Sequence, residues 1–225
     1  MPAELQTERR DNALILTISD PGSHSLLSRQ VFTAGVESLS VAESDADIQC
    51  ILLRGEGAHF CADVNLPLWS ETPEAAADMR RHFQDFAEAL RVFPKPVIAV
   101  VEGMACGDGF WLALACDLIV AARDAEFLPF PTRAGLEHGP GGLAAEPMHA
   151  LPRSLLLEWM WLGDPVPAAR LHQLGYVNQL ADRGQALQQA LALAGRLASI
   201  GSSAHLALAK EHVNHDRLAV RPGFQ

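Results

Sequence analysis

The stretch that runs from Val101 to Asp117, "VEGMACGDGFWLALACD", joins the end of an apolar strand to a glycine turn and an apolar helix. Gly107 and Gly109 allow the backbone to turn closely around a ligand. The helix that follows Gly107 directs its first N–H groups, and the positive end of its dipole, toward that ligand. The alternative is that the glycines only allow a strand and a helix to pack closely. The stretch therefore predicts a strand–turn–helix unit, with or without an anion site.

Strands and helices alternate on both sides of this unit. Apolar strands are expected at 13–18, 50–57, 96–103, 117–122 and 176–180, and helices at 28–41, 72–93 and 108–116, around Leu143, Ser154 and Pro167, and over most of the remainder. The strand "PVIAVVEG" is apolar at successive positions, as in a sheet covered on both faces. The segment "FLPFPTRAGLEHGPGG", 127–142, is rich in Pro and Gly and is expected to be irregular. The alternation predicts an α/β fold with a helical C-terminal part.

Charge and composition exclude several classes of protein. The chain has 225 residues, and 17 basic against 27 acidic residues give a formal net charge of −10, which argues against nucleic acid or an anionic membrane as the main partner. Four cysteines at positions 50, 61, 106 and 116 form no CxxC pair, so we expect buried thiols rather than a metal site. The first residues lack an apolar signal region, and no apolar run approaches the ~20 residues that span a bilayer. We therefore expect a soluble cytoplasmic protein.

Four segments occur together in an order and spacing that resemble the crotonase, or enoyl-CoA hydratase/isomerase, superfamily. They are "ILLRGEGAHFCADVNL", "KPVIAVVEGMACGDGFWLALACDLIVAA", "AEFLPFPTRAGLEHGPGG" and "GDPVPAARLHQLGYVNQL". The resemblance covers about Ala13 to Lys210. It implies a crotonase-like spiral of ββα units over residues 1–140. Residues 141–225 would form a helical C-terminal part of the same domain that packs on the core and on neighbouring subunits, as a homotrimer or a dimer of trimers.

The resemblance also implies a site for an acyl-CoA thioester, with no cofactor beyond the CoA moiety of the substrate and no metal. Two backbone N–H groups of the family stabilise the enolate oxygen, and by position these belong to Val64 and Asp108. The neighbouring residues that would contact the ligand are Ala62, Asp63, Leu66 and Gly107. One such donor contributes about 2.7–4 kcal/mol when it is aimed at developing charge. The family also implies a role in fatty acid metabolism.

Several family positions carry unexpected residues. The two hydratase carboxylates fall on Trp111 and Pro131, neither of which exchanges a proton in the required way. We expect Trp111, Pro131 and Phe130 to line an apolar substrate pocket that suits a flat acyl group. Asp63 and Asp108 replace glycines of the family. Asp108 is expected to cap its own helix, and Asp63 to lie in a solvated loop.

Glu137 and His138 are the substitute acid–base candidates, because they lie in the loop that borders the acyl pocket in the family. The alternative is that both are exposed loop side chains. His59 is expected to be a solvent-facing turn residue. Lys95 and Arg54 are cations of the kind that meet CoA phosphates, although single basic residues more often pair on the surface. The chain ends at "RLAVRPGFQ", before a further helical segment typical of the family, so fewer CoA contacts are expected.

Two functions follow from these residues. The first is an enzyme, an isomerase, decarboxylase or carbon–carbon lyase rather than a true hydratase, because a stabilised enolate removes most of the barrier to each of these reactions. The second is a catalytically inactive protein of the same fold that binds acyl-CoA or serves a structural role. A dinucleotide-binding protein is a weaker alternative, since "GMACGDG" does not fit the GxGxxG spacing.

Overall fold

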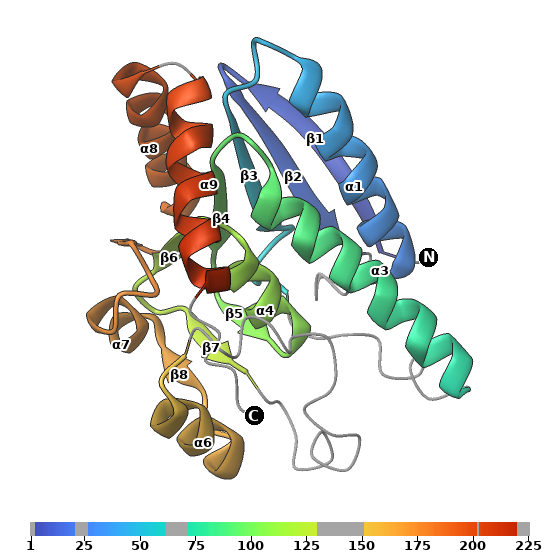
Figure 1. Ribbon diagram of the computed structural model, residues 1–225. Helices are drawn as coiled ribbons and strands as arrows, with labels where there is room; N and C mark the ends of the chain where they lie inside the picture. The colour runs from blue at the N-terminus through green and yellow to red at the C-terminus, as the bar shows by residue number, and fades with distance from the viewer. Residues whose placement is uncertain (1–2, 21–26, 62–71, 130–150, 202, 220–225) are drawn as a thin grey trace.

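The computed structural model describes residues 3–20, 27–61, 72–129, 151–201 and 203–219. These residues form two β-sheets with helices packed around them (Figure 1). The strands are β1 (Glu4–Arg10), β2 (Ala13–Ser19), β3 (Cys50–Gly55), β4 (Val97–Val101), β5 (Met104–Cys106), β6 (Leu118–Ala122), β7 (Glu126–Leu128), β8 (Val166–Pro167) and β9 (Gln179–Ala181). The helices are α1 (Arg29–Ser44), α3 (Pro73–Val92), α4 (Asp108–Ala115), α6 (Arg153–Leu162), α7 (Ala168–Gln173), α8 (Ala186–Ile200) and α9 (Ser203–Ala219).

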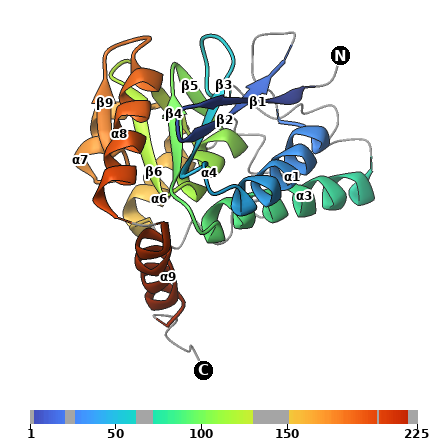
Figure 2. The same cartoon turned by 90° about the horizontal axis from the view of Figure 1, so that it is seen from above.

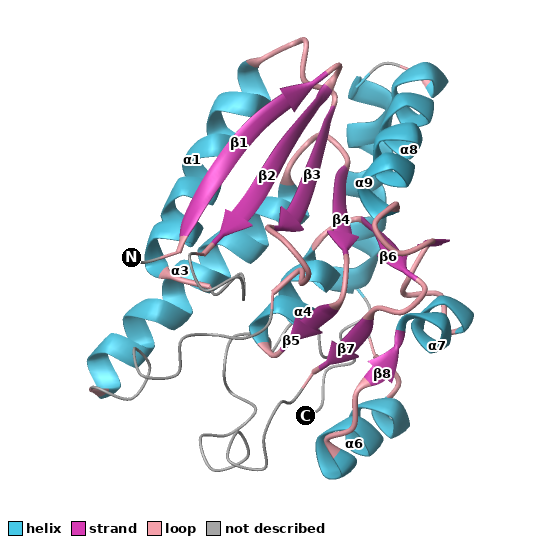
Figure 3. Ribbon diagram, turned by 180° about the vertical axis from the view of Figure 1, so that it is seen from behind, coloured by secondary structure: helices cyan, strands magenta, loops and turns pink. Residues whose placement is uncertain are grey.

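The larger sheet has the strand order β1-β2-β3-β4-β6-β9 (Figure 3). Strands β2, β3, β4, β6 and β9 are parallel, and only β1 runs antiparallel to its neighbour. All five residues of β4 are buried, as expected for an apolar strand that is covered on both faces. Because parallel strands end at the same edge, the segments that follow β2, β3 and β4 all start from one side of the molecule.

Strand β1 was not expected from the sequence. It pairs along its whole length with β2 through a tight turn in which Asp11 has a φ of 51°, a conformation that Asp tolerates better than most residues. Six of its seven residues are exposed, all except Leu5. Such charge on an edge strand discourages pairing with other chains. It also removes the apolar alternation by which a strand is recognised.

Helices cover both faces of the large sheet. Helix α1 packs on β1 and β2 and against α3, whereas α8 packs on the opposite face, against β3, β4 and β6 (Figure 2). Phe32 of α1 contacts Phe83 edge-on, with ring centroids 5.6 Å apart. A Cβ at Gly35 would lie 2.3 Å from the Phe86 ring, so glycine sets how closely the two helices approach. The packing of α3 on α1 explains why the apolar positions of α3 recur with helical periodicity.

Helix α9 extends away from the body of the molecule (Figure 2). Two side chains hold it to the core: Lys210 donates to the Leu90 carbonyl at 3.1 Å, and Asn214 donates to the Arg91 carbonyl at 3.2 Å. Among the residues that the structure describes, no single helix has the length and apolar composition needed to cross a membrane. Within the same described residues, α8 and the first part of α9 have that length and composition only when they are taken together, and the chain bends by 102° between them.

The smaller sheet, β5-β7-β8, lies beyond the end of β4 (Figure 3). Its strands have two or three residues each, too short for a periodic pattern. The expectation that 127–142 is entirely irregular is wrong at its start, because Phe127 and Leu128 belong to β7. The helix expected around Leu143 lies outside the described residues.

Candidate active site

Two chain segments that are far apart in the sequence meet beside the small sheet. Cys61 forms a parallel bridge with Ala105 of β5. The Cys61 N–H donates to the Met104 carbonyl at 3.1 Å, and the Cys106 N–H donates to the Cys61 carbonyl at 2.8 Å. Since the two segments are parallel, the chain after Cys61 and the chain after Cys106 leave the bridge in the same direction. The end of the described segment at Cys61 therefore lies next to Gly107 and α4.

Gly109 makes this approach possible. A Cβ placed on Gly109 would lie 2.5 Å from the Cys61 Cβ, 2.8 Å from its sulfur and 3.1 Å from its carbonyl oxygen. Cys61 is fully buried, so it has no free space into which to move. The second glycine of the turn thus has a tertiary role, which is to bring the first turn of α4 against the end of the Cys61 segment.

Gly107 turns the chain into α4. Its φ of 52° and ψ of −119° lie in a region that favours glycine. Gly107 is the N-cap residue, and its N–H donates to the Leu128 carbonyl at 2.8 Å. Because glycine has no side chain, the first N–H groups of α4 receive no side-chain cap from this position. The helix start therefore has the positive end of the dipole and donor groups that a ligand can use.

Asp108 is the first residue of α4 rather than its N-cap, so the expected capping role at that position is wrong. Its side chain is half-buried. A carboxylate in the first helical turn interacts favourably with the helix dipole. The backbone N–H of Asp108, predicted as an oxyanion donor, lies at this helix start.

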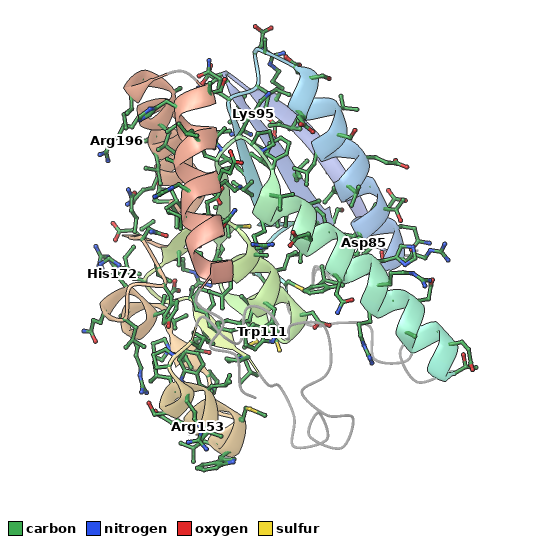
Figure 4. All side chains as sticks on the ribbon, viewed as in Figure 1. Asp85, Lys95, Trp111, Arg153, His172 and Arg196 are labelled. Atoms are coloured by element: carbon green, nitrogen blue, oxygen red, sulfur yellow. The ribbon has the colours of Figure 1, made fainter. Side chains whose placement is uncertain are left out.

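Trp111, on α4 (Figure 4), belongs to an aromatic cluster. It is 4% exposed, and its ring packs edge-on against Phe110 at a centroid distance of 4.9 Å. Phe110 also meets Phe127 at 6.1 Å and Trp159 at 6.0 Å, both edge-on. An indole in such packing neither accepts nor releases a proton. Trp111 therefore has a packing role in the structure and supplies no acid or base at this position.

The remaining predicted site residues lie outside the described residues. They are Ala62, Asp63, Val64, Leu66, Phe130, Pro131, Glu137 and His138. Of the predicted site, the structure therefore describes Gly107, Asp108 and Trp111, and it places all three in one turn of chain. Of the two predicted backbone donors, Val64 and Asp108, the structure describes only Asp108.

Lys95 and Arg54, the two basic residues considered as phosphate contacts, both donate to backbone carbonyls. Lys95 is 6% exposed, and its Nζ donates to the carbonyls of Ala42 and Asp45 at 2.6 and 2.7 Å. Burial lowers the pKa of Lys95, while Asp45 and Glu43 oppose that shift. The Lys95 side chain therefore holds the end of α1. Arg54 donates to the Gly55 carbonyl at 3.1 Å.

His59 was expected to face solvent, and this expectation is wrong. It is half-buried, and its Nδ1 accepts the N–H of Met104 at 3.1 Å, which helps to hold the start of β5. Sequence reasoning also missed Cys61 and Gly109 as a contact. The signal in the sequence was Gly109 itself, but a single sequence does not show which residue packs against it.

Within the described ranges, no group of three or more His, Cys, Asp or Glu side chains could hold a metal ion. Two surface hollows formed by described residues, of about 460 and 360 Å³, lie on α1 around Thr33 and on α9 around Leu208. Both are remote from the start of α4 in the chain. We place the candidate site at the Cys61–Gly109 contact because the glycine turn and the start of α4 meet the Cys61 segment there.

Comparison with known proteins gives consistent matches over most of the chain. A family model described as enoyl-CoA hydratase/isomerase matches residues 8–221. A 2,3-dehydroadipyl-CoA hydratase of Escherichia coli is 32% identical over 197 residues, which are 87% of this chain and 76% of that protein. A 1,2-epoxyphenylacetyl-CoA isomerase of the same organism is 31% identical over 191 residues, with 83% and 72% covered. The crystal structure of an enoyl-CoA hydratase from a Polaromonas species has a TM-score of 0.85 at 38% identity and covers 96% of this chain and 88% of that one.

Proposed function

Because the chain belongs to the enoyl-CoA hydratase/isomerase family, we propose that it binds an acyl-CoA thioester and stabilises the enolate formed from it. The observation that carries the proposal is the parallel bridge between Cys61 and Ala105. This bridge brings Cys61 beside the helix start at Gly107. The proposed second donor, Val64, is three residues further along the chain.

In this proposal the thioester oxygen accepts hydrogen bonds from the N–H groups of Val64 and Asp108. Val64 is assigned from the sequence, and Asp108 is supported by its place at the start of α4. The oxygen gains negative charge as the α-carbon loses a proton, a carboxyl group or a carbon–carbon bond. Donors that are fixed before the reaction stabilise that charge more than they stabilise the neutral carbonyl, and so they lower the barrier.

The reaction is isomerisation, decarboxylation or carbon–carbon cleavage rather than hydration. Addition of water to a conjugated double bond needs one group to activate water and another to protonate carbon. Trp111 supplies neither, since its indole is buried in the aromatic cluster. Glu137 and His138 remain the proposed proton-transfer residues, on sequence grounds alone.

We also propose that the chain assembles as a homotrimer or a dimer of trimers through its C-terminal helices. Large apolar side chains at the junction of α8 and α9 support this, because Ile200 and Leu208 are each 66% exposed and Val213 is 55% exposed. Exposed apolar groups of this size are typical of protein contacts. Sedimentation equilibrium should give a mass of three or six chains, whereas a monomer at micromolar concentration would contradict the assembly.

Exchange of the α-proton with solvent tests the proposed function. A saturated acyl-CoA such as butyryl-CoA is titrated by calorimetry and then incubated with the protein in D₂O, and deuterium at the α-carbon is followed by mass spectrometry. Binding together with exchange is expected, and Glu137→Gln or His138→Gln should slow the exchange without weakening binding. Rapid hydration of crotonyl-CoA would contradict the assigned reaction class. Absence of any binding would contradict the function itself.

A second candidate is a protein that binds acyl-CoA without catalysis. The 4% exposure of Trp111 favours it, because the cluster occupies space next to the proposed oxyanion site. In this case calorimetry detects binding, but neither α-proton exchange nor turnover of any thioester in a panel of isomerase and decarboxylase substrates is seen. The same two measurements therefore separate the two candidates.

A further inference from the structure

Arg80 of α3 is a half-buried charged residue in an acidic protein. Its Nε is buried, and it makes no hydrogen bond within the part of the chain that the structure describes. The other described arginines of the same helix are paired, Arg81 with Asp78 and Arg91 with Glu88 at 2.7 Å. A guanidinium nitrogen that loses water without gaining an acceptor carries a desolvation cost. Such a cost suggests that the acceptor is a ligand.

The face of α3 that carries Arg80 is turned away from α1. Contacts with α1 come from Asp78, which pairs with Arg29 at 3.5 Å, and from Phe83 and Phe86, which meet Phe32. At about 100° per residue, Arg80 lies roughly 160° around the helix from Asp78. By the same measure it lies about 120° from Phe86 and about 60° from Phe83, so it points away from the middle of the α1 contact. Helix α3 also packs on α4, which lies on its other side from α1 (Figure 1). Arg80 is therefore on the α4 side of α3.

Arg80 also lies beyond the start of α4 along the helix direction. Helices α3 and α4 both lead into parallel strands, and Lys210 Nζ donates to the Leu90 carbonyl at 3.1 Å and to the Asp117 carboxylate at 2.8 Å, which brings the two C-terminal ends together. Helix α3 has 20 residues and α4 has 8. At about 1.5 Å per residue, Arg80 is about 18 Å back from Val92, and Asp108 is about 10 Å back from Ala115. The Arg80 backbone thus lies several Å in front of the helix start where the thioester oxygen is proposed to bind.

We propose that Arg80 is a specificity-determining residue that binds a carboxylate at the end of the acyl chain remote from the thioester. The inference rests on the proposed function. A guanidinium presents a planar set of N–H donors that matches a carboxylate, and a partly buried charge pair excludes substrates that would leave the cation unpaired. The thioester oxygen at α4 and the carboxylate at Arg80 would then hold the two ends of a short dicarboxylic acyl group. A CoA phosphate has the same chemistry and is the other source of an anion.

A pair of thioesters that differ only in the remote end tests the proposal. Adipyl-CoA ends in a carboxylate and hexanoyl-CoA ends in a methyl group, and both are titrated by calorimetry, together with free CoA. The native protein is expected to bind adipyl-CoA at least about tenfold more tightly than hexanoyl-CoA. Arg80→Met should abolish that preference through weaker adipyl-CoA binding, with hexanoyl-CoA and free CoA unchanged.

Arg81→Met is the matched control, because Arg81 is the next residue, is exposed and is paired with Asp78. It should keep the preference, and urea unfolding should show that both variants are folded. Equal binding of the two thioesters by the native protein overturns the inference and leaves the proposed function standing. Loss of free CoA binding in Arg80→Met overturns it in favour of a phosphate contact. Failure of the native protein to bind either thioester overturns both.

Discussion

At the scale of single residues, the fold depends on two glycines that have different reasons to be there. Gly107 has a positive φ, which the sequence indicates directly because a turn between a strand and a helix needs such a residue. Gly109 lies inside α4, where other residues also fit, and only its closeness to Cys61 requires a residue without a side chain. That closeness depends on chain packing between positions 48 residues apart and could not be predicted from one sequence.

Replacement of Gly109 by Ala tests this contact. The added Cβ would meet Cys61 at 2.5 Å, so the Cys61 segment or α4 must shift, and we expect a loss of about 1–3 kcal/mol in the free energy of unfolding. Urea unfolding followed by circular dichroism measures it. In Gly195→Ala, the matched control in α8, the new Cβ has no atom within 4 Å. This variant should be unchanged or up to about 1 kcal/mol more stable, because alanine favours a helix.

If Gly109→Ala and Gly195→Ala had equal stability, the close approach of Cys61 to α4 would be wrong. The proposed oxyanion site would then lose its geometric basis, since that approach is what brings the segment after Cys61 to the helix start.

Trp111 gives a second prediction at this scale. It is 4% exposed, whereas Trp161 of α6 is 72% exposed. Trp111→Ala is therefore expected to cost about 3–5 kcal/mol, because it removes a large buried ring and leaves a cavity. Trp161→Ala should change the free energy of unfolding by less than about 0.5 kcal/mol. Thermal and urea unfolding of the two variants check this, and a small effect at Trp111 would mean that the aromatic cluster is not packed as described.

At the scale of helices and strands, prediction from the sequence worked where burial imposes a pattern. The apolar steps of α3 and the uninterrupted apolar run of β4 were both recognised, because one face or both faces of these elements are buried. Strands β1 and β5 were missed for opposite reasons, since β1 is charged and exposed and β5 has only three residues.

Helix α9 is held by an ion pair whose energetics can be tested. Lys210 Nζ lies 2.8 Å from the Asp117 carboxylate, which also accepts the Val97 N–H. Lys210→Met leaves that carboxylate without its cation, and we expect a loss of about 1–3 kcal/mol. Asp117→Asn should cost less, because the amide oxygen still accepts from Val97. The double variant should resemble Asp117→Asn, and a simple sum of the two losses would contradict a direct coupling.

The pH dependence of this pair has a definite sign. Burial raises the pKa of Asp117 above its usual 3.8, while Lys210 and the Val97 N–H oppose the shift. The folded state then binds this proton more tightly than the unfolded state does, so the group's contribution to stability increases as pH falls through its native pKa toward the unfolded value. Loss of Lys210 removes an opposing influence and raises the pKa further. The deficit of Lys210→Met should therefore be smaller at about pH 5 than at about pH 7, as measured by urea unfolding at each pH.

At the scale of the whole molecule, the two sheets share one core. Phe127 of β7 and Ala105 of β5 belong to the same buried cluster as Leu53 and Val101 of the large sheet. This connection between the sheets was not expected from the sequence, in which the small sheet leaves no pattern. A shared apolar core predicts that both sheets unfold in one cooperative step.

The four cysteines report on that step, because they are buried in different parts of the fold. Their exposures are 1% for Cys50, 0% for Cys61, 4% for Cys106 and 8% for Cys116. Burial raises the pKa of Cys50 to about 12 and also raises that of Cys116, so neither is a reactive thiolate in the native state. A maleimide should modify all four at one slow rate that increases with urea as global unfolding does, whereas Thr33→Cys on the exposed face of α1 should react at once. Faster modification of Cys61 and Cys106, followed by mass spectrometry of the peptides, would mean that the small sheet opens by itself, and the candidate site would then belong to a separately unfolding unit.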